Sequence, residues 1–345
     1  MTCVKEIVGD IERWRAAGER VALATVVAAR RSAPRPIGSK LGVSSGGELA
    51  GSVSGGCVEN DVYGEAQEVL GGGGPRLLTY GISDELAFEV GLPCGGEIDV
   101  FVEAADEELL GRLERIVDEE RRAVVFTVLE GEDAGEKRLV EEGEADELVA
   151  GLLRGGRSKV LELEGRKVFA EVFEPPPRLL VIGAVDTAEA LCRAATQLGW
   201  TTIVADARGR FATAERVPSA DELIVAWPDE ALERVRPDFG TAVVVLTHDD
   251  KFDVPALKGA LGTEAFYIGA LGSRRNQERR RERLLEAGVA EEALERISGP
   301  SGLDIGAHTP AETALSILAE ILAVRAGREG GALKRAAGRI HAEVA

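Results

Sequence analysis

Two segments of the sequence place a cysteine beside a pair of glycines, in Ser52-Val-Ser-Gly-Gly-Cys57-Val-Glu59 and in Leu92-Pro-Cys94-Gly-Gly-Glu97. Glycine leaves the backbone uncovered, so each thiol is expected to border exposed amide groups. Cys57 also directly precedes a predicted helix, where the helix dipole and the free N–H groups favour a thiolate. We predict that the core residues of the two motifs bind a ligand: Cys57, Cys94, Gly55, Gly56, Gly95 and Gly96.

The other roles open to the cysteines are structural and catalytic. Four cysteines in a chain of this length are no disulfide framework, and Cys3 and Cys192 are expected to be ordinary buried thiols. Neither glycine-flanked cysteine belongs to a CxxC pair and the chain has only three histidines, so no structural zinc site is expected. Catalysis by a cysteine–histidine pair remains an alternative, with His248 and His308 as the available partners.

A basic stretch lies upstream of the first cysteine motif. The segment from Arg30 to Lys40 gathers four basic residues in a chain whose formal net charge is −19. Local positive charge on an acidic background is explained by an anionic ligand or by the acidic patch of a partner. We predict Arg35 and Lys40 as anion partners; the alternative is that the basic residues pair internally with acidic side chains.

In the second half of the chain, Gly183-Ala-Val-Asp-Thr-Ala188 follows a predicted strand and opens a predicted helix, as a dinucleotide-binding turn does. Asp206 lies 23 residues after Gly183, where a ribose-binding carboxylate is expected. However, Val185 replaces the middle glycine, and Asp186 with Glu189 predicts a capping box that uses the amides a phosphate would need. The turn and Asp206 are therefore candidate nucleotide contacts, and a Rossmann domain kept only for its shape is the alternative.

Two further glycine-containing loops precede helices. Tyr267-Ile-Gly-Ala-Leu-Gly-Ser-Arg-Arg275 leads into a basic helix and fits an anion site at Gly272, Ser273 and Arg274. The arginines beyond Arg275 are expected to pair with nearby glutamates. The segment from Gly299 to Pro310 has the residues of a normal helix entry, with a ligand contact as the alternative.

The elements that must position these residues lie in two halves of the chain that differ in the pattern of their apolar residues. After the triple proline of Phe173–Arg178, five short apolar runs alternate with helical patterns, which is typical of a parallel sheet with crossover helices. The runs are Leu179–Ile182, Ile203–Ala205, Leu223–Val225, Ala242–Leu246 and Ala265–Ile268. We predict an α/β fold with a Rossmann-like, doubly wound domain over residues 178–345.

The first half predicts an α+β domain over residues 1–172, in which residues 105–172 form a connecting segment of strands and one helix. Predicted helices lie around Ile7–Trp14 and over Val58–Leu70 and Glu107–Glu119. The predicted strands are Val21–Ala28, Lys40–Val43, Leu49–Val53, Leu77–Tyr80 and Ile98–Glu103.

Composition narrows the function classes. With 41 Lys and Arg against 60 Asp and Glu, general binding to nucleic acid or to an anionic membrane is disfavoured. No apolar stretch approaches the roughly 18 residues that span a bilayer, and the first twenty residues are charged throughout. We therefore expect a cytoplasmic protein.

Together, these motifs resemble the XdhC/CoxI family, the accessory proteins of xanthine dehydrogenase and related molybdenum hydroxylases. SAPRPIGSK, GSVSGGCVEND and LPCGGEIDVFVE are similar to the family's N-terminal domain. RLLVIGAVDTAEAL, GWTTIVADAR, YIGALGSRR and GPSGLDIGAHTPAETALSILAEI are similar to its C-terminal Rossmann domain. The likeness covers the chain except for about residues 105–170.

The resemblance implies that the protein binds and protects molybdenum cofactor as cargo. It further implies that the cofactor receives its terminal sulfur with the help of a cysteine desulfurase and is then handed to an apo-hydroxylase. Cys57 and Cys94 match the family's glycine-flanked cysteines, and thiolates are soft ligands suited to a metal–sulfur centre. An accessory role without turnover follows, although such sequences are often labelled xanthine dehydrogenase; a homodimer is one alternative for the oligomeric state.

The chain departs from the family where the family commonly has G-A-G-H-V-A and this sequence has Gly183-Ala-Val-Asp-Thr-Ala188. This departure weakens the expectation of a bound nucleotide. The competing hypotheses are an NAD(P)-dependent oxidoreductase, with Asp206 on the ribose and His248 or His308 as acid–base, and a nucleotide-binding regulatory protein.

Overall fold

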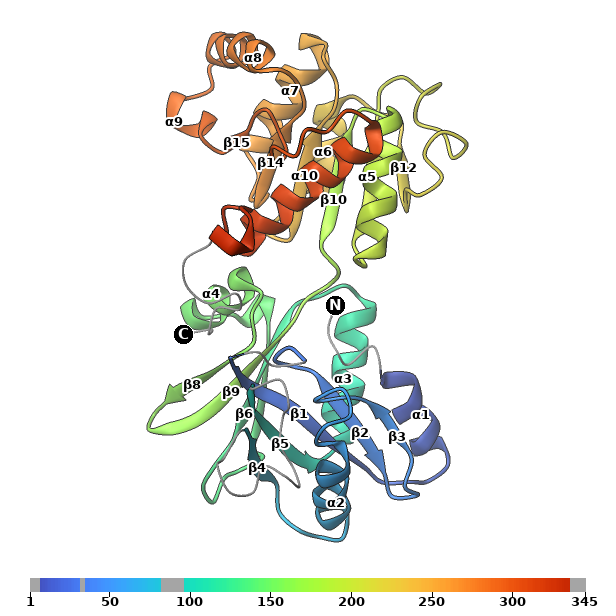
Figure 1. Ribbon diagram of the computed structural model, residues 1–345, viewed down its shortest axis with the longest axis vertical. Coiled ribbons are helices and arrows are strands. Elements are labelled where there is room, and N and C mark those ends of the chain that lie inside the picture. Colours follow the sequence, from blue (N-terminus) through green and yellow to red (C-terminus); the bar gives the residue numbers. More distant parts are fainter. Residues whose placement is uncertain (1–6, 32–34, 82–95, 336–345) are drawn as a thin grey trace. The chain divides into compact units, whose positions relative to one another are not determined.

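A computed structural model of the 345-residue chain describes residues 7–31, 35–81 and 96–335. The chain divides into two compact units, the first extending to Pro175 and the second running from Pro176 to Arg335 (Figure 1). None of the helices in these described ranges is both long enough and apolar enough to cross a bilayer.

The first unit contains an antiparallel sheet of five strands in the order β3-β2-β1-β5-β4. Its strands are β1 (Val21–Arg30), β2 (Lys40–Ser44), β3 (Leu49–Gly51), β4 (Arg76–Tyr80) and β5 (Glu97–Ala104). Helix α2 (Glu59–Leu70) covers one face, where Val62 and Ala66 pack against Leu41 and Val43 of β2. Helix α1 (Val8–Ala16) packs on the other face through Ile11 and Trp14.

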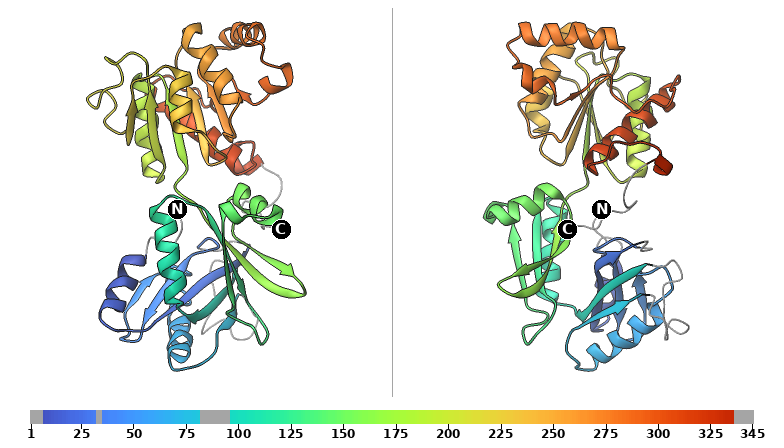
Figure 2. Two further views of the ribbon diagram at one scale, coloured as in Figure 1. Left: turned by 180° about the vertical axis from the view of Figure 1, so that it is seen from behind. Right: turned by 60° about the vertical axis from the view of Figure 1, so that its left-hand side comes forward.

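A second antiparallel sheet in the same unit has four strands in the order β7-β6-β9-β8 (Figure 2). These strands are β6 (Ala123–Val128), β7 (Lys137–Glu141), β8 (Lys159–Leu163) and β9 (Arg166–Phe173). Helices α3 (Glu107–Asp118) and α4 (Glu147–Gly155) belong to this region, and a 3₁₀ turn spans Glu142–Glu144. Asp106 and Asp146 cap α3 and α4 by accepting backbone N–H hydrogen bonds, which satisfies donors that the helices leave open.

The two sheets of the first unit share a buried contact. Phe101 of β5 and Phe169 of β9 meet in one apolar cluster together with Val27 and Leu129. Beside them lie four charged side chains, of which Lys40, Glu103 and Glu171 are buried and Lys137 is half-buried. The region predicted as a connecting segment is therefore packed against the first sheet within this unit.

The second unit is a parallel sheet of six strands in the order β12-β11-β10-β13-β14-β15, the doubly wound arrangement. The strands are β10 (Arg178–Ile182), β11 (Thr201–Ala205), β12 (Glu222–Ile224), β13 (Thr241–Val245), β14 (Tyr267–Ala270) and β15 (Ile297–Ser298). The helices are α5 (Asp186–Gln197), α6 (Pro228–Val235), α7 (Asp250–Leu261), α8 (Arg274–Glu286), α9 (Glu291–Leu294) and α10 (Pro310–Arg325), with a 3₁₀ turn at Leu333–Arg335.

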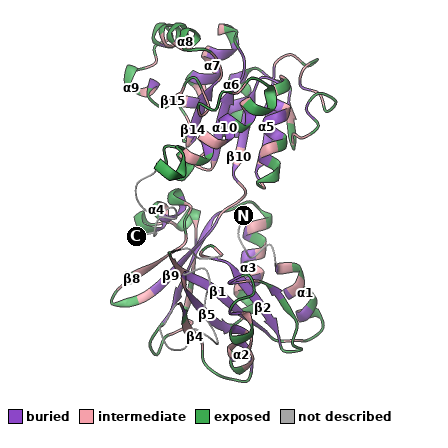
Figure 3. Cartoon of the chain, in the orientation of Figure 1, coloured by how far each residue is buried: buried purple, intermediate pink, exposed green. Residues whose placement is uncertain are grey.

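Both faces of this sheet are covered, which explains why its strands are continuous apolar runs (Figure 3). Alternate residues of β10 point to opposite faces: Leu179 and Val181 pack with α5 and α10, whereas Leu180 and Ile182 pack with α6 and α7. The predicted α/β class, with a Rossmann-like second half and an α+β first half, is confirmed.

Details of the predicted elements shift by one or two residues. The run Ala265–Ile268 enters the sheet late, as β14 at Tyr267, and the run Leu223–Val225 is strand Glu222–Ile224. The helix entry predicted before Pro310 is confirmed, because Thr309 and Glu312 form a reciprocal capping box.

Candidate functional site

Three segments singled out in the sequence leave the same end of the first sheet. Strand β1 ends at Arg30, which pairs with Glu97 at the start of β5. Strand β3 ends at Gly51, which pairs with Leu41 near the start of β2. Strand β4 ends at Tyr80 opposite Ile98, and β2 begins at Lys40 opposite Thr25, so the strand ends that flank segments 31–39, 52–58 and 81–96 all face this side of the sheet. We call this the loop end of the first sheet.

Cys57 is exposed at the loop end, in the segment that joins β3 to α2. Its neighbours Val53, Ser54 and Val58 are buried, at 0%, 2% and 1% exposure, and anchor the segment on both sides of the thiol. Gly55 and Gly56 have φ values of +80° and +113°, a region that residues with a side chain rarely adopt. The two glycines therefore fold the segment back on itself and leave the thiol on its outer side.

The second cysteine motif is described only at its C-terminal root. Cys94 and Gly95 lie outside the described residues, whereas Gly96 is buried and directly precedes β5. Because β5 lies beside β1, this root reaches the same end of the sheet as the first motif.

The carboxylate of Glu59, the first residue of α2, lies inside the Cys57 segment. Oε1 accepts hydrogen bonds from the Ser52 hydroxyl at 2.6 Å and from the amides of Val53, Ser54 and Gly55 at 3.2, 2.8 and 3.0 Å. Oε2 accepts from the Gly56 amide at 2.8 Å and from the Ser54 hydroxyl. The expectation of free amides at Gly55 and Gly56 is therefore wrong, because an internal carboxylate already accepts from both.

These contacts change the acidity of Glu59. Partial burial would raise its pKa, but hydrogen bonds from the Ser52 and Ser54 hydroxyls and from the Ser54 amide lower the pKa of Glu59 to about 2. The group is thus a carboxylate at neutral pH. Sequence reasoning did not identify Glu59 as a site residue; the available signal was an acidic residue in the first helical turn directly after a glycine loop.

Two arginines of the basic stretch have different partners: Arg30 forms internal ion pairs, and Arg35 contacts the loop end. Arg30 donates to Glu97 at 2.5 Å and to the buried Asp99 at 2.8 Å, so its charge is used inside the sheet. Arg35 donates from Nε to the Ser52 carbonyl at 3.4 Å, which brings its guanidinium to the Cys57 segment. Of the two predicted anion partners, Arg35 is the one that contacts the segment containing Cys57.

Lys40 points the other way. Leu41 and Val43 of β2 face α2, so Lys40 projects from the opposite face of the sheet. Its side chain is 6% exposed, and Nζ lies 2.9 Å from the Glu171 carboxylate and 3.0 Å from Thr25 Oγ1. The prediction of Lys40 as an anion partner is thus replaced by an internal ion pair with a residue 131 positions later in the chain.

Lys40 belongs to a set of four charged side chains, of which three are buried and Lys137 is half-buried. Lys137 Nζ lies 2.7 Å from Glu103 Oε1, and both pairs line one cavity of about 40 Å³ between the two sheets. Burial raises the pKa of Glu103, against the opposing effect of Lys137 and Lys40. We call Lys40, Glu171, Lys137 and Glu103 the buried quartet.

In the second unit, the backbone of the turn after β10 is engaged in internal contacts. Gly183 adopts φ +111°, and a Cβ there would lie 2.8 Å from Thr247 Cγ2, so both the backbone conformation and the packing require glycine. The Ala184 amide donates to Asp206 at 3.0 Å, and the Val185 amide donates to the Gly183 carbonyl. Two amides of the turn are therefore already used.

The capping box predicted for this helix is wrong. Helix α5 begins at Asp186 with Val185 as its cap and without a side-chain capping hydrogen bond. Glu189 instead accepts from the amide and hydroxyl of Ser219, at 3.1 and 2.8 Å. The longer-range contact with the loop after β11 replaces the local one.

Asp206 directly follows β11, as predicted, but its carboxylate is already hydrogen-bonded within the protein. Arg208 donates to it from Nε at 2.9 Å and from a terminal nitrogen at 2.7 Å, and Asp206 is 4% exposed. Burial alone would raise the pKa of Asp206, and the Arg208 hydrogen bonds lower it. Arg208, which sequence reasoning missed although it lies two residues away, thus uses the carboxylate oxygens that would accept from ribose hydroxyls.

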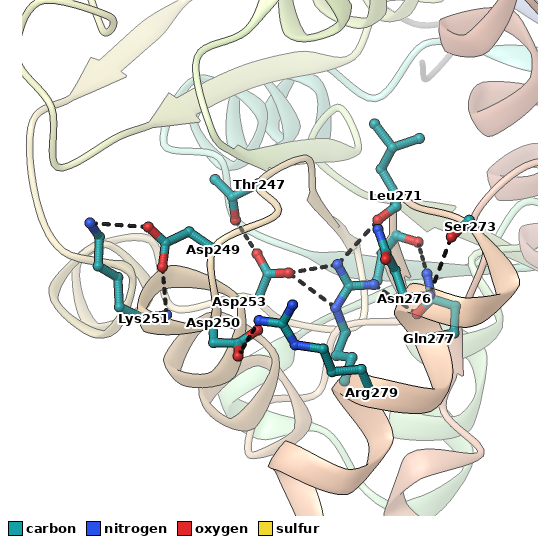
Figure 4. Close-up of polar contacts among 12 residues, drawn as sticks. Thr247, Asp249, Asp250, Lys251, Asp253, Leu271, Ser273, Asn276, Gln277 and Arg279 are labelled. Carbon is teal, nitrogen blue, oxygen red and sulfur yellow. Dashed lines mark hydrogen bonds and ion pairs between the residues drawn. The ribbon is translucent and has the colours of Figure 1, made fainter.

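The loop before α8 leads into the helix through an ordinary serine N-cap. Ser273 caps the helix by accepting from the Asn276 amide (Figure 4). Gly272 has φ +147°, and Arg274 is exposed. Beyond Arg275, the expected pairing with nearby glutamates holds for Arg281 with Glu291 and for Arg283 with Glu286. It is wrong for Arg279, which pairs with Asp250, and for the buried Arg280, which pairs with Asp253 of α7.

The remaining candidate catalytic residues are divided between the two units. His248 and His308 are exposed residues of the second unit, whereas Cys57 lies in the first. Within the described ranges, no group of three or more His, Cys, Asp or Glu side chains could hold a metal ion. Cys192 is buried in α5, as predicted.

Comparisons with known proteins agree with this two-part organisation. A family model described as the XdhC and CoxI family matches residues 14–81, and one described as the XdhC Rossmann domain matches residues 179–321. A protein of Bacillus subtilis, described as a probable subunit of xanthine dehydrogenase, is 30% identical over 316 residues, which are 89% of this chain and 94% of that protein.

A second relative is the molybdenum cofactor insertion chaperone PaoD of Escherichia coli, 31% identical over 314 residues, or 90% of this chain and 86% of the relative. Among solved structures, one described as a xanthine dehydrogenase from Bacillus halodurans aligns with a TM-score of 0.69 at 26% identity. That alignment covers 96% of this chain and 98% of the other.

Proposed function

The chain belongs to the XdhC and CoxI family, and from that premise we propose that it is an accessory protein that carries molybdenum cofactor for a xanthine dehydrogenase-type hydroxylase. The cofactor is its cargo, bound at the loop end of the first sheet. The observation that carries the proposal is the exposed Cys57 thiol on a glycine-folded segment whose Ser52 carbonyl accepts a hydrogen bond from the Arg35 guanidinium. The full-length relationship to an insertion chaperone supports the same role.

The residues of the loop end suit this cargo chemically. A thiolate at Cys57 is a soft ligand of the kind that binds a metal–sulfur centre, and Arg35 supplies the positive charge that a phosphate requires. Cys94 and Gly95 belong to the proposed site through the second motif, whose root at Gly96 reaches this end of the sheet. Gly55 and Gly56 contribute by leaving space beside the thiol rather than by offering free amides.

In the second unit, the segment Gly272–Arg274 is our candidate for an anionic group, because exposed Arg274 opens a helix of 13 residues. An ordinary NAD(P) site at Gly183 and Asp206 is not proposed, since Arg208 and the turn's own contacts occupy the groups it would use. Addition of NAD or NADP is accordingly expected to leave the melting temperature unchanged.

The partners follow from the cargo. We propose that the chain receives the cofactor, supports addition of its terminal sulfur by a cysteine desulfurase, and passes it to the apo-hydroxylase in the cytoplasm. The acidic surface implied by a net charge of −19 would contact basic regions of these partners.

The test is an anaerobic titration of the purified chain with molybdenum cofactor, comparing wild type with Cys57→Ala and Cys94→Ala. Cys192→Ala is the matched control, because Cys192 is buried in the second unit and contacts no proposed ligand. We expect one cofactor per wild-type chain and Cys192→Ala chain, and at least about tenfold weaker binding by the other two variants, equivalent to losing one good contact. Equal affinity in Cys57→Ala would overturn the proposed site.

A further inference from the structure

Resting on the proposed function, we infer that Glu59 is a positioning residue that fixes the Cys57 thiol for the cofactor. Glu59 does not contact the cargo in this account. It acts by holding the segment 52–58 in one conformation before the cargo arrives.

Glu59 and two serine hydroxyls account for the whole set of backbone donors in the segment. The amides of Val53, Ser54, Gly55 and Gly56 donate to the Glu59 carboxylate, at 2.8–3.2 Å. The amides of Cys57 and Val58 donate to Ser54 Oγ at 2.9 and 3.0 Å, and the Ser54 hydroxyl donates in turn to Glu59. Every N–H from Val53 to Val58 therefore depends directly or indirectly on one carboxylate.

The segment has buried residues that anchor it and exposed residues that include the Cys57 thiol. Val53, Ser54 and Val58 are buried and Glu59 is half-buried, while Gly55, Gly56 and Cys57 are exposed. An exposed run of three residues would ordinarily be mobile, and ordering it on binding would cost affinity. Because the hydrogen bonds to Glu59 order the run in advance, the thiol is preorganised.

Both the charge and the length of Glu59 are required. A glutamine would turn one acceptor oxygen into an NH₂ donor, which would face an N–H or O–H donor of the segment and leave it without an acceptor. An aspartate would keep the charge but shorten the reach by one methylene. Glu59→Asp is therefore the conservative variant, expected to keep part of the hydrogen bonding to the segment that Glu59→Gln loses.

The first experiment measures amide hydrogen exchange over residues 53–58 in the full chain, without cargo. We expect Glu59→Gln to accelerate exchange there at least about tenfold, with Glu59→Asp intermediate and the amides of β1 unchanged. Glu68→Gln is the matched control on the same helix, since Glu68 is exposed and its partner Arg76 also pairs with Glu65. Unchanged exchange in Glu59→Gln would overturn the inference.

The second experiment is a double-mutant cycle on cofactor affinity. If Glu59 acts through Cys57, Glu59→Gln weakens binding about tenfold in the wild-type chain but less than about twofold in a Cys57→Ala chain. Equal losses in both backgrounds would mean that Glu59 acts independently of the thiol, which contradicts a positioning role.

The two experiments separate this inference from the proposed function. If the wild-type chain binds no cofactor, the proposed function fails, and the alkylation rate of Cys57 by iodoacetamide replaces affinity in the same comparison of Glu59→Gln with Glu68→Gln. An altered rate in Glu59→Gln alone would still support control of the thiol by Glu59. An unaltered rate would overturn that control.

Discussion

Replacing Lys40 with methionine is the sharpest test of how the first unit is built. Methionine keeps most of the apolar stem of lysine and removes only the charged head. Because Lys40 and Glu171 are 6% and 10% exposed, the substitution leaves the carboxylate buried without its partner. The buried quartet then holds two carboxylates, Glu171 and Glu103, and a single cation, Lys137.

The size of the effect follows from that imbalance. Removing one partner of a buried pair costs about 3–5 kcal/mol in the free energy of unfolding, whereas exposed pairs contribute about 0–1 kcal/mol. We therefore expect Lys40→Met to cost about 3–5 kcal/mol and Lys167→Met, whose partner Glu130 is 56% exposed, to cost less than about 1 kcal/mol. The double variant Lys40→Met/Glu171→Leu restores charge balance and should recover most of the loss.

The assay must resolve the two units, because a single melting curve for a two-unit chain does not define one free energy. Hydrogen exchange in increasing urea, measured over peptides of β1, β2 and β9, reports the first unit alone. A loss below about 1 kcal/mol for Lys40→Met would refute the buried pair. Weakened cofactor binding at unchanged stability would refute it too, since that outcome requires Lys40 to face the ligand.

Three further predictions concern single residues. With its pKa at about 2 in the folded chain against an ordinary 4.5, Glu59 stabilises the fold fully above pH 4.5 and less as the pH falls toward 2; the unfolding free energy of Glu59→Gln should lack this slope, and equal slopes would contradict it. Iodoacetamide should label Cys57 in the native chain but Cys192 only after unfolding, because burial raises the pKa of Cys192 to about 12; mass spectrometry showing similar rates would be inconsistent with this. Thr309→Ala, which removes the cap of α10, should cost the second unit about 1 kcal/mol by urea-dependent exchange, and no cost would argue against the capping box.

The sequence predicted best what depends on local pattern. Continuous apolar runs such as Leu179–Ile182 identified the parallel sheet, because burial on both faces leaves no alternation to interpret. The start of the helix after Thr309 was also predictable from the local sequence, since the capping partner of Thr309, Glu312, lies three residues away.

Side-chain partners distant in the sequence could not be predicted. Lys40 pairs with Glu171, 131 residues later in the chain. Glu189 accepts a hydrogen bond from Ser219, 30 residues later, instead of capping its own helix. The role of Glu59 needs the backbone path of two glycines with positive φ, which composition alone does not reveal. Charge and motif thus indicated the loop end, but only the fold showed which side chains face it.

Delivery of the cargo tests the central proposal most directly. Wild-type chain loaded with molybdenum cofactor would be mixed with an apo-hydroxylase of the xanthine dehydrogenase type, and recovery of hydroxylase activity followed against the same amount of free cofactor. If the chain carries the cofactor, activation by the loaded chain is faster and more complete, and Cys57→Ala loses that advantage. Activation no better than with free cofactor, by a chain that is demonstrably loaded, would contradict the proposed role as carrier.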